Sequence, residues 1–112
     1  MNIVITGGTG FLGSKLAEKF YKENHNVTII DIKKNSINKI TEQKSKIKFI
    51  KANILSQKSL SKIKIKNNSI LLHCAGQPSG AMSFQKPLDD MKKNIEGMIN
   101  IIDFSKKKKL KR

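Results

Sequence analysis

A glycine-rich segment near the N-terminus constrains the fold of this chain more than any other feature. It reads TGGTGFLG over residues 6–13 and follows IVI, a β-branched run of the kind found in buried strands. After the glycines, apolar residues recur every fourth position to about residue 23, as on one face of an amphipathic helix: Leu12, Leu16 and Phe20. Strand, glycine turn and helix in this order are typical of the first unit of an α/β protein.

The spacing of the glycines indicates a phosphate-binding turn. In such a turn Gly7 permits the tight bend, Gly10 lets backbone amides approach a pyrophosphate, and Gly13 lets the helix pack close to the strand. The positive N-terminus of the helix then faces the phosphates, so no basic side chain is required to bind them. The segment therefore predicts a dinucleotide site.

An acidic residue follows the second predicted strand, which spans residues 27–30. The carboxylate of Asp31 can accept hydrogen bonds from the hydroxyl groups of an adenosine ribose, and its charge repels a 2′-phosphate. The sequence therefore favours NAD over NADP as the ligand. The alternative, NADP, rests on Lys33 and Lys34, because basic residues just past this strand can accommodate that phosphate.

The rest of the chain continues to alternate strands and helices. Strands are predicted over residues 47–52 and 69–75, and short helices near residues 37–40 and over residues 56–63. A long amphipathic helix is predicted from Pro87 onward, with an apolar stripe at spacings of three and four: Leu88, Met91, Ile95, Met98 and Ile102. This alternation predicts an α/β fold, a Rossmann-like doubly wound parallel sheet of about four strands in the order 3-2-1-4.

Composition limits the other classes of function. The 112 residues leave room for one domain, and 23 Lys and Arg against 8 Asp and Glu give a formal charge of +15, which raises nucleic acid as a partner. The lysines are spread over nearly every segment, Arg112 is the only arginine and aromatic residues make up 5%, so nucleic-acid binding is the less favoured interpretation. No apolar run reaches the roughly 18 residues of a membrane span and no signal peptide opens the chain, so a cytoplasmic location without a membrane partner is expected. Cys74 is the only cysteine, so neither a disulfide nor a metal site is predicted.

Together these segments resemble the extended short-chain dehydrogenase/reductase family, and within it the NAD-dependent epimerases and dehydratases similar to UDP-glucose 4-epimerases. The three-residue spacing of the glycines is typical of that family. The resemblance implies NAD as the cofactor and implies roles for residues along the whole chain. The implied cofactor-binding residues are Gly7, Gly10, Phe11, Leu12 and Gly13 in the first turn, Asp31, Asn35 and Ser36 after the second strand, Asn53 and Ile54 after the third, Ala75 and Gly76 after the fourth, and Asn94 on the last helix.

The resemblance also implies an activity for full-length members, in which NAD takes a hydride from a nucleotide sugar and returns it. Such members carry a Tyr-x-x-x-Lys pair for acid–base catalysis, whereas the only tyrosine here, Tyr21, is followed four residues later by His25. Residues 1–112 are therefore expected to form an incomplete N-terminal NAD(P)-binding Rossmann domain that lacks the substrate domain and the catalytic segment and is inactive alone. No catalytic residue is predicted, since His73 and Cys74 are interpreted as core residues of the fourth strand.

Two alternatives and one feature of assembly stay open. The chain is alternatively a non-catalytic dinucleotide-binding module or sensor, or a basic protein associated with nucleic acid. Residues 77–79, Gln-Pro-Ser, resemble epimerases acting on CDP-linked deoxysugars more than those acting on UDP-glucose. An unpaired edge at the fourth strand makes a homo-oligomer possible.

Overall fold

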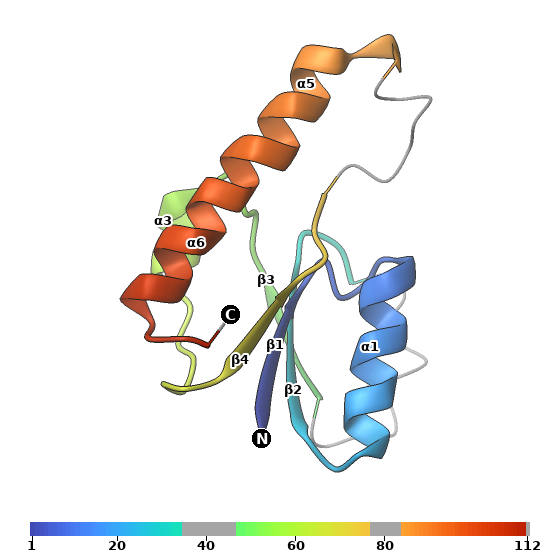
Figure 1. Cartoon of the computed structure of the whole chain (residues 1–112), viewed down its shortest axis with the longest axis vertical. Helices are drawn as coiled ribbons and strands as arrows, with labels where there is room; N and C mark the ends of the chain where they lie inside the picture. The colour runs from blue at the N-terminus through green and yellow to red at the C-terminus, as the bar shows by residue number, and fades with distance from the viewer. Residues whose placement is uncertain (35–46, 77–83, 112) are drawn as a thin grey trace.

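The computed structural model describes residues 1–34, 47–76 and 84–111 and contains a four-stranded sheet flanked by helices on both faces (Figure 1). All three strand pairings are parallel and the strand order is β3-β2-β1-β4, so the predicted fold is confirmed. The predicted helix near residues 37–40 lies outside the described residues. The elements are β1 (Asn2–Thr6), α1 (Phe11–Lys22), β2 (Asn26–Asp31), β3 (Ile47–Lys51), α3 (Gln57–Ser61), β4 (Ile70–His73), α5 (Pro87–Met91), the π-helical segment η1 (Lys92–Glu96) and α6 (Gly97–Lys107).

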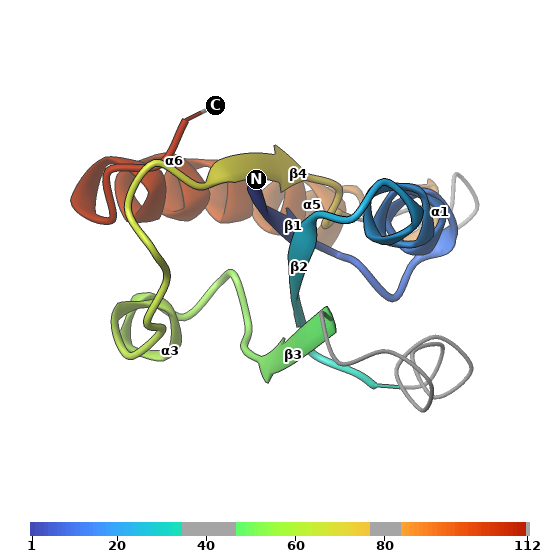
Figure 2. The same cartoon turned by 90° about the horizontal axis from the view of Figure 1, so that it is seen from below.

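Both faces of the sheet are buried because α1 covers one face and α3 and α6 cover the other (Figure 2). On the α1 side, Ile3 and Ile5 pack with Ala17 in one apolar cluster. On the other side, Val4 packs with Ile101 and other apolar residues of a second cluster. This arrangement explains the continuous β-branched run of β1, and it brings the carboxyl ends of the strands together at one edge of the sheet.

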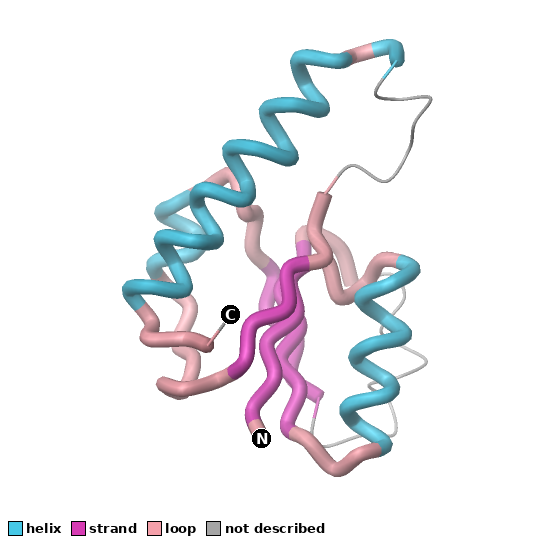
Figure 3. Tube along the Cα trace, in the orientation of Figure 1, coloured by secondary structure: helices cyan, strands magenta, loops and turns pink. Residues whose placement is uncertain are grey.

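The structure places the predicted apolar stripe of the last helix in solvent. The helical run is continuous from α5 through η1 to α6 (Figure 3), and its N-terminal part extends beyond the carboxyl ends of the strands. The stripe residues are between 38% and 77% exposed. Because η1 has a π-helical turn, it shifts the helical phase between α5 and α6. The buried residues of α6 are Gly97, Asn100, Ile101, Phe104 and Ser105.

The outer edge of β4 is partly paired, which differs from the prediction of an open edge. Lys109 adopts a positive φ of 52° after α6, and the chain returns to the sheet. The N–H group of Leu71 donates to the carbonyl of Lys111 over 2.8 Å, and the Lys111 N–H group donates to the Ser69 carbonyl over 2.9 Å. Leu110 is buried in the same cluster as Val4. The described part of β4 is also shorter than predicted, because residues 74–76 leave the strand.

Candidate functional site

Three of the four glycines in residues 6–13, those of the predicted phosphate-binding pattern, have different surroundings. Gly7 has a φ of 68°, and a Cβ atom there would lie 2.5 Å from the backbone nitrogen of Ala75. A Cβ atom on Gly13 would lie 2.2 Å from the carbonyl oxygen of Gly7. A Cβ atom on Gly10 would approach only the carbonyl oxygen of Gly7, at 3.3 Å. The fold itself therefore requires glycine at positions 7 and 13, whereas Gly10 leaves open space above the turn.

The open space lies at the N-terminus of α1. Gly10 is the N-cap residue, and no side chain forms a capping hydrogen bond with this helix end. The first intrahelical bond runs from the Ser14 N–H group to the Gly10 carbonyl over 2.9 Å, so the amides of residues 11–13 precede it. Phe11 is 88% exposed and Leu12 is 59% exposed beside these amides. Backbone donors at a helix N-terminus next to apolar side chains fit the pyrophosphate of a dinucleotide.

Asp31 is attached to the glycine turn by hydrogen bonds. Its Oδ2 atom accepts from the backbone N–H group of Thr9 over 3.0 Å and from the Thr9 hydroxyl over 2.6 Å. Its Oδ1 atom accepts from the N–H group of Ile32 over 2.7 Å. The structure therefore brings the predicted ribose-binding carboxylate next to the predicted phosphate-binding turn. Sequence reasoning missed Thr9, because a hydroxyl between two glycines carries no periodic signal.

The end of β4 and the last helix complete this edge of the sheet. The N–H group of Cys74 donates to the Thr6 carbonyl over 2.9 Å, which places the next residue, Ala75, against Gly7. A Cβ atom on Gly76 would lie 3.0 Å from Oδ1 of Asn94. Of the predicted site residues, Ala75 thus lies against the glycine turn, and Asn94 lies beside Gly76, the residue that follows Ala75.

Two predicted residues after β3 have different surroundings. The Ala52 N–H group donates to the backbone carbonyl of Asp31 over 2.9 Å, so the chain after β3 starts beside the end of β2. Asn53 is exposed, and its Oδ1 atom accepts from the Leu55 N–H group over 2.9 Å. Ile54 is half-buried against the core. Asn35 and Ser36, also predicted to contact the cofactor, lie outside the described residues.

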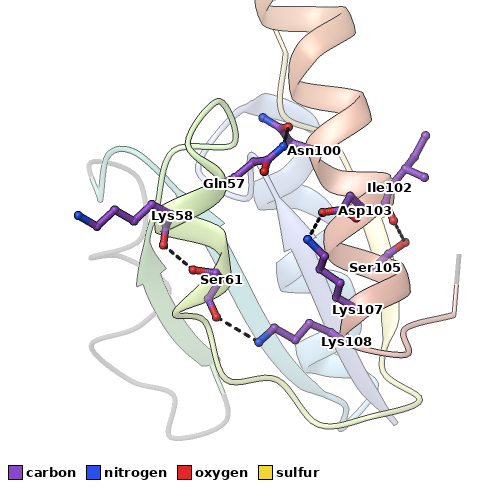
Figure 4. Close-up of polar contacts among 9 residues, drawn as sticks. All are labelled: Gln57, Lys58, Ser61, Asn100, Ile102, Asp103, Ser105, Lys107 and Lys108. Atoms are coloured by element: carbon purple, nitrogen blue, oxygen red, sulfur yellow. Dashed lines mark hydrogen bonds and ion pairs between the residues drawn. The ribbon is translucent and has the colours of Figure 1, made fainter.

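Polar contacts join α3 to α6 and to the residue that follows α6 (Figure 4). The Gln57 side-chain amide donates to Oδ1 of Asn100 over 3.2 Å, and the Asn100 amide donates to the Ile54 carbonyl over 2.9 Å. The Lys108 ammonium donates to the Ser61 carbonyl over 3.2 Å. These polar groups satisfy one another, so we assign this seam a structural role.

His73 at the end of β4 and Cys74 just after it are half-buried, whereas the sequence predicted both as core residues. His73 shares a hydrogen bond of 2.6 Å between its Nδ1 atom and the hydroxyl of Thr6, which is fully buried. Burial lowers the pKa of His73 and raises the pKa of the Cys74 thiol. The imidazole is therefore neutral and the thiol protonated at neutral pH, which does not favour a cysteine nucleophile. Tyr21 packs partly buried against the α1-side core.

A lysine-lined hollow of the surface lies away from the glycine turn. It has a volume of about 570 Å³ between β3 and α3, and no carboxylate is among its lining residues. Five lysines line the hollow: Lys48, Lys51, Lys58, Lys62 and Lys64.

In residues 1–34, 47–76 and 84–111, the search for a helix with the length and hydropathy of a membrane span finds none, and no cluster of three metal-ligating side chains is found.

Comparison with characterised sequences places this arrangement in a family. The model of the NAD dependent epimerase/dehydratase family matches residues 3–112. A UDP-glucose 4-epimerase of Schizosaccharomyces pombe is 33% identical, with 94% of this chain and 31% of the relative covered. A UDP-N-acetyl-alpha-D-glucosaminuronate decarboxylase of Bacillus cytotoxicus is 31% identical, with 96% of this chain and 34% of the relative covered. The chain thus spans about a third of the length of the curated relatives it matches.

Solved structures agree with this placement. A UDP-glucose-4-epimerase from Stenotrophomonas maltophila with bound NAD and formylated UDP-arabinopyranose is 27% identical, has a TM-score of 0.77, and is matched over 95% of this chain and 33% of its own. An epimerase from Methanothermobacter thermautotrophicus, at 24% identity, shares the fold with a TM-score of 0.84 over 97% of this chain and 32% of its own. A family match over nearly every residue, together with the glycine turn and its neighbouring carboxylate, shows that this chain belongs to the NAD-dependent epimerase/dehydratase family.

Proposed function

We propose that this chain binds NAD at the carboxyl edge of its sheet, as the dinucleotide-binding portion of an enzyme that acts on a nucleotide sugar. The observation that carries the proposal is the uncapped N-terminus of α1 beside an anchored carboxylate. The amides that would donate to a phosphate and the Asp31 carboxylate that would accept from a ribose lie at adjacent strand ends, and Thr9 links them. A turn that served only to connect β1 with α1 would not need the open space above Gly10.

The residues divide the binding task among them. The amides at positions 11–13 donate to the pyrophosphate, and their helix dipole favours its charge. Asp31 accepts from the adenosine ribose, and Asn53 lies beyond it on the adenine side. Gly76 and Asn94 lie on the other side of the turn, where they support the nicotinamide half. Bound NAD supplies the hydride acceptor and donor of the reaction.

The residues of this edge hold the cofactor but offer no acid–base pair. Among the described residues at the carboxyl ends of β1, β2 and β4, the titratable side chains are Asp31, His73 and Cys74. The Asp31 carboxylate accepts hydrogen bonds from Thr9. Burial lowers the pKa of His73 and raises the pKa of the Cys74 thiol, and both shifts favour the uncharged form. We therefore assign residues 1–112 to cofactor binding, and epimerase or dehydratase turnover to a whole protein that includes a Tyr-x-x-x-Lys pair.

A second candidate function is a dinucleotide-binding module that does not catalyse a reaction itself. Such a module needs only the features that the described residues carry, the glycine turn and the Asp31 carboxylate joined to it through Thr9. Both functions predict NAD binding. They differ in whether a continued reading frame supplies the acid–base pair, which sequencing of the DNA beyond the codon for Arg112 decides.

Calorimetric titration of the chain with NAD and NADP tests the proposal. We expect NAD to bind and to raise the melting temperature, and NADP to do so less. Asp31→Ala should reduce the preference for NAD. Asp103→Ala is the matched control, because this carboxylate pairs with Lys107 on α6 and does not touch the glycine turn. Equal stabilisation of the wild-type chain by NADP would show that the role assigned to Asp31 is wrong.

A further inference from the structure

The Asp31 carboxylate accepts three hydrogen bonds from within the protein, which ribose binding alone does not require. A carboxylate offers about four acceptor positions on its two oxygens. The Thr9 amide and hydroxyl occupy two positions on Oδ2, and the Ile32 amide occupies one on Oδ1. One position on Oδ1 therefore stays available to a ribose hydroxyl, and the orientation of the carboxylate is fixed before any ligand binds.

Without this anchor, other partners compete for the carboxylate. Lys51 on β3 is the register partner of Asp31, and Lys33 and Lys34 follow it in the chain. An aspartate free to rotate can pair with such ammonium groups, and an ion pair there would neutralise the charge that repels a 2′-phosphate. Thr9 donates the shortest hydrogen bond that Asp31 receives, at 2.6 Å.

We propose that Thr9 is a positioning residue that determines cofactor specificity: its hydroxyl holds the Asp31 carboxylate away from the neighbouring lysines and so selects NAD over NADP. This inference rests on the proposed NAD site. It adds a residue that the glycine pattern does not include, and it couples the phosphate-binding turn to the ribose-binding strand end.

The test compares Thr9→Val, Thr9→Ser and Ser14→Ala with the wild-type chain. Valine keeps the shape of threonine but lacks the hydroxyl, and serine restores the hydroxyl. Ser14 is the control, because its hydroxyl donates to the Phe11 carbonyl near the same turn without touching Asp31. Dissociation constants for NAD and NADP are measured by calorimetry, and melting temperatures without ligand report on folding.

We expect Thr9→Val to lower the NAD-over-NADP preference by about tenfold, the size typical of losing one hydrogen bond to a charged group. Thr9→Ser should restore the preference and Ser14→Ala should keep it. A Thr9→Val preference equal to that of the wild type, measured on a chain that melts normally, would overturn the role of Thr9 while leaving NAD binding intact. Absence of NAD binding by the wild-type chain would instead overturn both the proposed function and this inference.

Discussion

An added methyl group should leave the fold unchanged at Gly10 and disturb it at Gly13. Gly10 has φ −75° and ψ 177°, a conformation that any residue adopts, and the new Cβ atom would meet only the Gly7 carbonyl oxygen at 3.3 Å. In Gly13→Ala the Cβ atom would lie 2.2 Å from that oxygen and 2.8 Å from the Cα atom of Gly8. The first substitution therefore leaves the unliganded fold intact, and the second forces the backbone of the turn to move.

The magnitudes separate the two variants. Overpacking of this kind costs about 1–3 kcal/mol, which lowers the melting temperature of a domain of this size by roughly 4–12 °C. Gly10→Ala should melt as the wild type does but should bind NAD roughly 100-fold more weakly, because losing two amide–phosphate hydrogen bonds costs about 3 kcal/mol. Gly10→Val should abolish binding, since its branched side chain fills more of the space.

Circular dichroism melts and calorimetric NAD titrations on the same preparations provide the assay. The reasoning is refuted if Gly13→Ala melts with the wild type, because the close packing of α1 on the turn would then not limit the structure. It is equally refuted if Gly10→Ala binds NAD as tightly as the wild type, because the space above this glycine would then not hold the pyrophosphate.

Three further outcomes follow from the structure. The purified chain should not turn over UDP-glucose, UDP-galactose or CDP-linked sugars, because it carries no Tyr-x-x-x-Lys pair and acid–base catalysis ordinarily contributes on the order of 10² to 10⁴ in rate. Epimerisation above the buffer blank in independently tagged preparations would contradict this. Stability should fall as the pH drops below the ordinary His73 pKa of 6.5, because burial lowers the folded-state pKa and protonation favours unfolding; melts of His73→Gln should depend less on pH over that window. Sedimentation should show self-association that grows with salt, since screening beyond about 10 Å at 0.1 M weakens the repulsion of the +15 charge. Ile95→Lys should reduce this self-association by interrupting the exposed apolar stripe of the last helix. A wild-type chain that stays monomeric at all salt concentrations would rule out the β4 edge and the stripe as contacts.

The sheet could be predicted from sequence because its signals are local. Each strand carries a β-branched or apolar run, and each carboxyl end carries a glycine or a polar residue. The start of α3 is also local, since the Ser56 hydroxyl accepts from the Ser59 N–H group over 3.1 Å, and serine is a common residue at this position of a helix. Parallel order 3-2-1-4 followed from right-handed crossovers between these local elements.

The buried face of the last helix could not be predicted, because it depends on contacts distant in sequence. The spacing of the apolar stripe suits a regular helix, but η1 interrupts the α-helical phase. Gly97 then lets α6 approach Ile54, where a Cβ atom would lie 2.6 Å from the isoleucine Cδ1 atom. Leu110, among the lysines that follow α6, returns to fill the core. None of these contacts leaves a periodic pattern in the sequence.

Part of the candidate site was accessible to sequence reasoning and part was not. The glycine spacing predicted Gly7 and Gly13, and the structure gives a steric reason for each. Asn53 and Ile54 were predicted as a pair, yet the structure exposes the first and packs the second against the core. The link between Thr9 and Asp31 joins two elements through side-chain geometry, which no spacing rule encodes.

Amide chemical-shift mapping of the wild-type chain titrated with NAD tests the central claim most directly. We predict shifts in the amide signals of residues 7–13, Asp31, Ala75, Gly76 and Asn94, with weaker changes when NADP is added. The lysine-lined hollow between β3 and α3 serves as the internal comparison, because five lysines line it and none of its lining residues belongs to the glycine turn. Shifts confined to Lys58, Lys62 and their neighbours would contradict an NAD site at the glycine turn, and equal shifts with NAD and NADP would contradict the selectivity assigned to Asp31.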